Sequence, residues 1–202
     1  MEGRSSIFAQ QVEQGTSKTD RNAENGIHIE RYFCPEGVNP FEQVEWERRQ
    51  ATIKDDKGNI LFQQDDVEVP KQWSQLATNV VASKYFYGEI GTAERESSIR
   101  QMIHRVTRTI ADWARDDGIF ATDADAEAFY DELTWLCLNQ YGAFNSPVWF
   151  NVGLFHVRGV EGSEGNFHWD KKRRCPIKTL RGYEYPQCSA CFIQSVDDTM
   201  ED

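Results

Sequence analysis

The sequence predicts an α/β fold, with a mainly helical N-terminal region that carries a β-hairpin and leads into further strands. Apolar residues alternate through positions 44–69 around a turn at 55–59. Three later segments repeat apolar residues every three or four positions, as amphipathic helices do. Near the C-terminal end, Phe192-Ile193 predicts a short buried strand.

Composition indicates a folded chain. The 202 residues are enough for a core, and 39% are hydrophobic, with 12 Phe, 7 Tyr and 6 Trp. Disordered chains are poor in aromatic residues, so the mean hydropathy of −0.66 reflects a polar surface. A net charge of −11 argues against nonspecific nucleic-acid binding, and no DNA binding is expected.

The chain divides into three expected regions. Residues 1–26 are rich in polar residues, lack any helical or strand period, and predict a disordered leader. Residues 27–142 form the N-terminal hairpin and helical region. Residues 143–202 begin a further domain that is cut short, because 197–202 resembles the first turn of an unfinished helix.

The hairpin and the first helix follow one another directly. Gly58, flanked by Asp and Asn, predicts the hairpin turn, and Pro70 ends the second strand and suits a helix start. The first helix is expected to bury one face at helical spacing. That face consists of Trp73, Leu76, Ala77, Val80 and Val81.

A second helix is expected from about Arg95. Its apolar face comprises Ile99, Met102, Ile103, Val106, Ile110 and Trp113. His104 lies off this stripe among arginines and predicts a solvated surface histidine, with a pKa lowered by the nearby cations.

A third helix should begin with a capping box at Thr122 and Asp125 and end at the glycine exit Tyr141-Gly142. Its apolar face makes Cys137 a core residue, and Cys34 is likewise expected to be a buried filler. The short connection predicts that the second and third helices pack as an antiparallel pair.

Localisation is constrained weakly by the sequence. No apolar run approaches 20 residues, and no secretory signal pattern is present. Five cysteines without a secretion signal predict free or redox-active thiols, so the expected compartment is the cytoplasm.

Two segments near the C-terminal end favour a chemical site. Asn145–Gly153 reads NSPVWFNVG, a helix exit followed by a Ser-Pro turn that frees N–H groups and a hydroxyl for an anion. Tyr185–Asp198 reads YPQCSACFIQSVDD and sets a thiol just before the apolar pair. Facing one another, the two segments would form a phosphate cradle beside a redox-capable cysteine.

The insert 154–184 is Gly-rich and then basic at Lys171–Arg174. We expect a solvated loop there, with a contact to a partner subunit or to a nucleotide phosphate as the alternative.

The cysteines allow three interpretations. Cys188 and Cys191 have CxxC spacing, but a zinc site would need the scattered His156, His168 and Cys175 as further ligands. A thioredoxin-like motif would need a helix after the pair, where a strand is expected. The third interpretation is a thiol pair that supplies two electrons to a substrate.

The two segments resemble the front of the catalytic domain of ribonucleotide reductases, most closely the adenosylcobalamin-dependent class II branch. Three further stretches share the resemblance, which spans roughly 27–202: Glu30–Phe33, Val44–Arg49 and Gly162–Asp170. It implies that 143–202 starts a ten-stranded α/β barrel. It also implies reduction of ribonucleotides to 2′-deoxyribonucleotides with adenosylcobalamin, bound mainly outside this chain.

The resemblance also assigns residue roles. Cys191 corresponds to one of the two reductant cysteines, while the radical cysteine lies outside the chain and Cys188 is a bystander. Ser146, with the backbone near Ala190, corresponds to the substrate phosphate site, although Ser146 also suits a plain turn. Asp198 corresponds to a contact with the deoxyribose of a specificity effector, although it also suits a helix N-terminus.

The implied partners are a ribonucleotide substrate, a dNTP effector, a thioredoxin-type reductant and a second copy in a homodimer. The piece alone is expected to be inactive. A class I large subunit and a noncatalytic nucleotide-binding or assembly module remain the alternatives.

Overall fold

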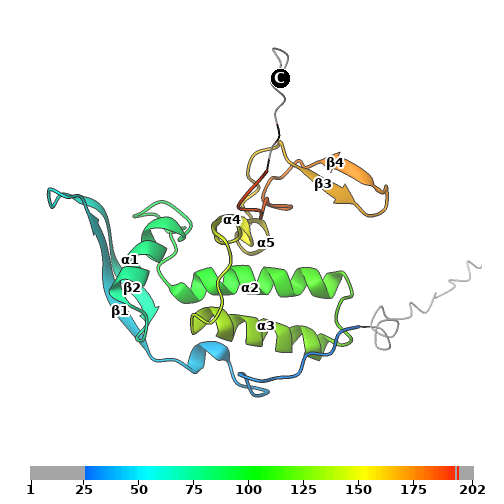
Figure 1. Ribbon diagram of the computed structural model, residues 1–202, viewed down its shortest axis with the longest axis horizontal. Helices are drawn as coiled ribbons and strands as arrows, with labels where there is room; N and C mark the ends of the chain where they lie inside the picture. Colours follow the sequence, from blue (N-terminus) through cyan, green and yellow to red (C-terminus); the bar gives the residue numbers. More distant parts are fainter. Residues whose placement is uncertain (1–25, 194, 196–202) are drawn as a thin grey trace, which may run out of the picture.

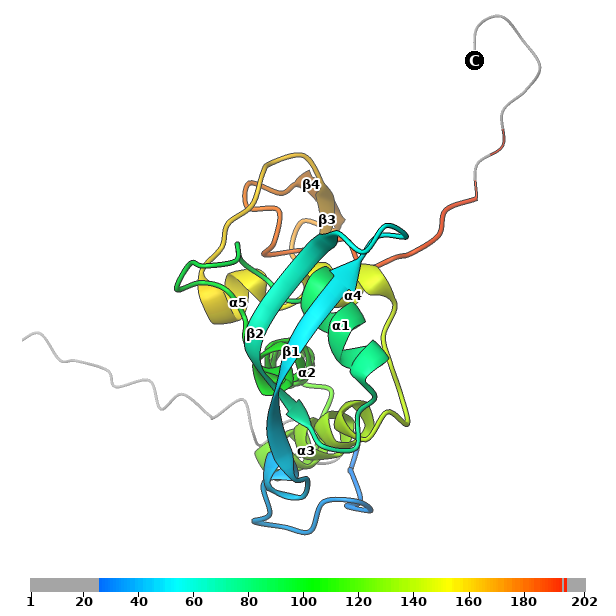
Figure 2. The ribbon, with the colours of Figure 1, turned by 90° about the vertical axis from the view of Figure 1, so that its left-hand side faces the viewer.

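The computed structural model describes residues 26–193 and 195. Its elements are η2 (Pro40–Glu42), β1 (Trp46–Lys54), β2 (Ile60–Pro70), α1 (Gln75–Lys84), α2 (Ile99–Asp116), α3 (Asp123–Leu138), α4 (Ser146–Asn151), α5 (Leu154–Arg158), β3 (Phe167–Asp170) and β4 (Cys175–Lys178). The β1–β2 ribbon packs on α1 (Figures 1 and 2). Helices α2 and α3 lie side by side. Helices α4 and α5 lie between α2 and the β3–β4 ribbon. This arrangement confirms the α/β class.

Both sheets of the described residues are two-stranded and antiparallel. The first confirms the predicted hairpin, with Trp46 opposite Pro70 and Ile53 opposite Phe62. Its turn contains Gly58 at a φ of 86°, a conformation that glycine adopts without steric cost. The ten-stranded barrel stays a prediction.

Only part of the face expected for the first helix is buried: Ala77 and Val81 pack against the core cluster. Leu76 and Val80 are 72% and 40% exposed, whereas Thr78 and Ala82 are fully buried against the hairpin. Thr78 is accommodated because its hydroxyl donates to a backbone carbonyl one turn earlier. Trp73 is buried, but it precedes the helix.

Helix α2 begins at Ile99 with Ser98 as its N-cap, four residues later than expected. Its predicted apolar face is confirmed: Ile99, Met102, Ile103 and Val106 are buried, and Ile110 and Trp113 pack against the same cluster. The expectation of a solvated His104 is wrong. Its Nδ1 lies 2.8 Å from the Tyr130 hydroxyl, and burial, more than the charge of Arg108, lowers its pKa.

Helix α3 has the predicted capping box, in which Thr122 and Asp125 each bond the other's backbone N–H. Its end differs from the prediction. The helix stops at Leu138, and the left-handed residue is Gln140 at a φ of 60°, not the expected glycine at 142. The N–H groups of 141 and 142 both donate to the carbonyl of Leu136, so the chain reverses earlier.

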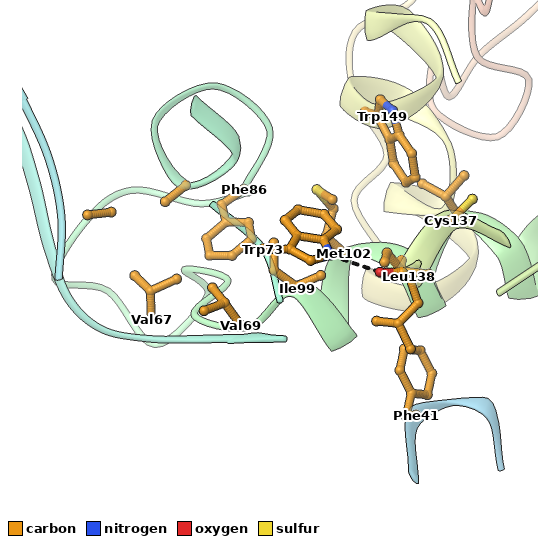
Figure 3. Close-up of a cluster of buried hydrophobic side chains, with 14 of the residues drawn as sticks. Phe41, Val67, Val69, Trp73, Phe86, Ile99, Met102, Cys137, Leu138 and Trp149 are labelled. Carbon is orange, nitrogen blue, oxygen red and sulfur yellow. Dashed lines mark hydrogen bonds between the residues drawn. The ribbon is translucent and has the colours of Figure 1, made fainter. Parts of the chain in front are cut away.

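One hydrophobic cluster joins the hairpin to the helices (Figure 3). It contains Val67, Val69, Trp73, Phe86, Ile99, Met102, Cys137, Leu138 and Trp149. The Trp73 indole N–H donates to the carbonyl of Leu138 at 2.8 Å, which satisfies the one polar atom of that side chain. Cys34 and Cys137 are buried, as predicted, and burial raises their pKa values to about 11 and about 12.

The insert 154–184 is more ordered than the expected solvated loop. It contains α5 and the β3–β4 hairpin, whose turn is the basic run Lys171–Arg174. The alternation of exposed and half-buried residues in both short strands explains why no strand was predicted from apolar content. None of the described helices has the length and apolar character needed to cross a membrane.

Candidate functional site

The first motif segment forms a short helix where a turn was expected. Asn145 caps α4 by accepting a hydrogen bond from the N–H of Val148 at 3.3 Å, and Pro147 occupies the first turn. Proline suits that position because the N–H it lacks would have no helical partner. Ser146 therefore begins a helix.

The C-terminal end of α4 is fixed to α2 by a buried arginine. Arg105, 1% exposed, donates to the carbonyls of Trp149 at 3.1 Å and Val152 at 2.7 Å. Its Nε donates to the carboxylate of Glu96 at 2.9 Å, which is 0% exposed. Gly153 follows at a φ of 82°, and a Cβ there would lie 2.3 Å from the Arg105 carbonyl oxygen. The segment can therefore approach α2 this closely only with glycine.

The Glu96 carboxylate accepts hydrogen bonds from three residues. Besides Arg105, it accepts from Arg158 of α5 at 3.0 Å and from the backbone N–H of Tyr87 at 2.9 Å. A buried carboxylate needs such partners, because leaving it unpaired in the interior costs several kcal/mol. The network thus ties α2, α4 and α5 together behind the motif segment.

The sequence interpretation missed this network. Arg105 follows Met102 by three positions and precedes Thr109 by four, and all three are buried. A charged residue at helical spacing from residues of the buried face was the signal that could have identified Arg105 as buried. Glu96 gave no comparable signal.

Ser146 faces a tyrosine that the sequence did not single out. Its hydroxyl oxygen lies 3.1 Å from the Tyr85 hydroxyl, and the Tyr85 ring stacks on Phe150 with 5.2 Å between centroids. Tyr85 also lines a cavity of about 320 Å³, whose other walls are mainly apolar core residues and the chain 140–144. The Ser146 hydroxyl therefore contacts a residue of the cavity wall, and Ser146 itself is not part of that wall.

Among the described residues, a direct hydrogen bond joins the second motif segment to the first. The Asn151 side chain at the end of α4 donates to the backbone carbonyl of Gln187 at 2.8 Å. Cys188 packs against the core cluster, and burial raises its pKa. Ala190 and Cys191 are exposed. The structure therefore brings the two segments together, with the Cys191 thiol accessible.

The expected buried strand after this thiol is wrong for the described residues. Phe192 and Ile193 are 66% and 102% exposed and belong to no strand. A strand needs a hydrogen-bonding partner, and within 26–193 none lies beside them. Asp198, the expected effector contact, lies outside the described residues.

The candidate zinc ligands are dispersed. Within the part of the chain that is described, no group of three His, Cys, Asp or Glu side chains could hold a metal ion. His156 accepts from the Trp113 indole at 3.1 Å, and His168 stacks on Tyr185. Both rings are thus engaged in packing and hydrogen bonding.

Comparisons with known proteins give one consistent result. Residues 47–89 and 88–140 match a family model described as class II vitamin B12-dependent ribonucleotide reductase. A vitamin B12-dependent ribonucleotide reductase of Rhodopirellula baltica is 60% identical over 179 residues, covering 88% of this chain and 17% of the relative. Namesakes from Streptomyces coelicolor and Agrobacterium fabrum are 39% and 34% identical, covering 89% and 86% of this chain and 16% of each relative.

The chain thus spans about one sixth of the length of these relatives. The matched family model supports class II over the class I alternative. The family model covers the β1–β2 hairpin and helices α1 to α3, and Arg105 of α2 holds the first motif segment. The chain belongs to the class II vitamin B12-dependent ribonucleotide reductases, as an N-terminal part of such an enzyme.

Proposed function

We propose that the full-length protein reduces ribonucleotides to 2′-deoxyribonucleotides by thiyl-radical chemistry. The observation that carries this is the hydrogen bond from Asn151 to the carbonyl of Gln187. It joins the segment that contains Ser146 to the segment that contains Cys191, which supports a single region for the proposed phosphate-binding hydroxyl and the proposed reducing thiol. Such a reaction needs both groups in one site.

In the proposed reaction, Cys191 is one of two reductant thiols. The ribose 2′-hydroxyl leaves as water, hydrogen takes its place, and the two thiols lose two hydrogens and close to a disulfide. The exposure of Cys191 supports this role, because the second cysteine and a thioredoxin-type reductant must both reach it. The second cysteine and the radical cysteine belong to other parts of the full-length protein.

Ser146 and the backbone at Ala190 are proposed to hold the substrate phosphate. The Ser146 hydroxyl is supported by Tyr85 at 3.1 Å, which leaves its other hydrogen-bonding directions for a phosphate oxygen. Asp198 is proposed to contact a dNTP effector in a homodimer of the full-length protein.

Adenosylcobalamin is the proposed cofactor, and it supplies a radical through homolysis of its Co–C bond. The residues described here do not fit it. The cavity lined by Tyr85, about 320 Å³, has the size of a site for a small drug, and a cobalamin is far larger. We assign no residue of this chain to the cofactor.

Residues 143–202 are proposed to begin the ten-stranded barrel, after the hairpin and helical region 27–142. The leader expected at 1–26 falls almost wholly outside the described residues. The proposed compartment is the cytoplasm, which is supported by five unpaired cysteines.

The test is turnover of the full-length protein with a ribonucleotide, adenosylcobalamin and dithiothreitol. We expect Cys191→Ser to abolish turnover and Ser146→Ala to raise KM. Cys34→Ser is the matched control, because that thiol is buried away from the site. Unchanged turnover in Cys191→Ser would overturn the reductant assignment, and turnover without cobalamin but with a radical-bearing partner protein would overturn the cofactor.

A further inference from the structure

The chain that leads to Cys191 is held by a side chain of the insert. After β4 it turns back toward α4 as the return segment, residues 179–188 (Figure 1). Asn166 lies just before β3 and is half-buried. Its side-chain amide donates to two carbonyls of the return segment, Gly182 at 3.1 Å and Tyr185 at 2.9 Å. An asparagine amide has two N–H donors, so both are used.

Asn166 is itself fixed at the base of the β3–β4 hairpin. Its backbone carbonyl accepts from the N–H of Thr179 at 2.8 Å, next to the last strand pair. Thr179 is 1% exposed, and its hydroxyl lies 2.9 Å from Nδ1 of His168. The His168 ring stacks on Tyr185 with 3.7 Å between centroids. The hairpin therefore holds Tyr185 by its backbone and by its ring.

A second amide holds the return segment two residues later. Asn151 at the end of α4 donates to the carbonyl of Gln187 at 2.8 Å, and the next residue, Cys188, packs against the core cluster. A chain bonded at one point can swing about that point, whereas bonds at Tyr185 and Gln187 also fix its direction. Three residues beyond Cys188 span at most about 11 Å, so these bonds limit where the Cys191 thiol lies.

This support matters for the proposed chemistry. A reductant thiol must meet the substrate in a productive geometry, and a misplacement of about 1 Å can cost roughly a hundredfold in rate. Residues that react need neighbours that lock their position. Cys191 is exposed and belongs to no helix or strand, so its position depends on the residues that hold the return segment.

We propose that Asn166 is a positioning residue for the reductant thiol, and that it acts together with Asn151. It acts through the backbone of the return segment. The β3–β4 insert thereby has a role in reduction, which is to set the direction of the chain that carries Cys191. The inference rests on the proposed function and adds to it a residue outside both motif segments.

The test is steady-state turnover of the full-length protein with a ribonucleotide, adenosylcobalamin and dithiothreitol. We expect Asn166→Ala to lower kcat at least about tenfold and to change KM less than about twofold, because it leaves the Ser146 hydroxyl in place. Asn151→Ala is a second, independent variant with the same expectation. Asn139→Ala is the matched control, since its amide also donates to a backbone carbonyl, that of Trp135 at 3.0 Å, at the end of α3.

Hydrogen exchange gives a readout that does not depend on turnover. Backbone N–H groups of residues 183–191 should exchange faster in Asn166→Ala than in the wild type, while exchange in α2 should stay the same. A merely destabilised protein would show faster exchange in both places. This comparison separates positioning from a general loss of stability.

Three outcomes overturn the proposal: an unchanged kcat in both Asn166→Ala and Asn151→Ala, an equal fall of kcat in Asn139→Ala, and unchanged exchange at 183–191. Absence of turnover in the wild-type protein would instead overturn the proposed function. Exchange at 183–191 would then still decide whether Asn166 holds the return segment, so the two failures are distinguishable.

Discussion

The buried network behind the motif segment gives the sharpest stability prediction. The change is Arg105→Met, which keeps most of the apolar stem and removes the guanidinium. Arg105 is 1% exposed, donates to the carbonyls of Trp149 and Val152, and pairs with Glu96 at 0% exposure. Its loss leaves two buried carbonyls without donors and a buried carboxylate with fewer partners.

The expected cost follows from these contacts. Removing one partner of a buried ion pair costs about 3–5 kcal/mol. Arg158 and the N–H of Tyr87 still bond Glu96, which keeps the cost within that range. We therefore expect the free energy of unfolding to fall by about 3–5 kcal/mol, a large part of the 5–15 kcal/mol that is typical of domains.

The assay is urea unfolding of this chain followed by circular dichroism. Arg48→Met is the matched control, because its pair with Asp66 is 55% and 74% exposed and should contribute less than about 1 kcal/mol. The double variant Glu96→Leu/Arg105→Met should cost less than the sum of its single changes by about 0.5–3 kcal/mol. A cost below about 1 kcal/mol for Arg105→Met, with an additive double variant, would refute the reasoning.

Three further outcomes are expected. Gly153→Ala should destabilise the chain by at least about 1–3 kcal/mol in thermal unfolding, because its φ is 82° and a Cβ would meet the α2 backbone; an unchanged Tm would contradict this. Iodoacetamide at pH 8 should label exposed Cys191 but not Cys137, whose burial raises its pKa to about 12; mass spectrometry checks this, and labelling of both before unfolding would count against the burial. The Thr122 hydroxyl, with backbone N–H groups, lowers the pKa of Asp125, so its stabilisation is complete above the unfolded pKa and is lost as the pH falls through the folded pKa. Asp125→Asn should therefore flatten the fall of Tm below about pH 4, and an unaltered pH profile would contradict this.

The two segments of the candidate site could be located from the sequence, but the residues that hold them in place could not. The segments around Ser146 and Cys191 were found by resemblance, and the structure joins them through Asn151 and Gln187. That bond links residues 36 positions apart, which no local period can reveal. The contact between Ser146 and Tyr85, which lies 61 positions earlier, could not be predicted for the same reason.

The sequence by itself determined the local elements: the hairpin, because Gly58 and strand alternation act within a few residues, and α2, because its apolar stripe repeats along one helix. The tertiary structure decided which polar groups are buried. The local pattern predicted His104 at the surface, whereas Tyr130 of α3 covers it. The pattern made no prediction for Glu96, which is buried and paired with Arg105 and Arg158. A helix period reports which residues share a face, whereas burial and pairing depend on the elements that pack against that face.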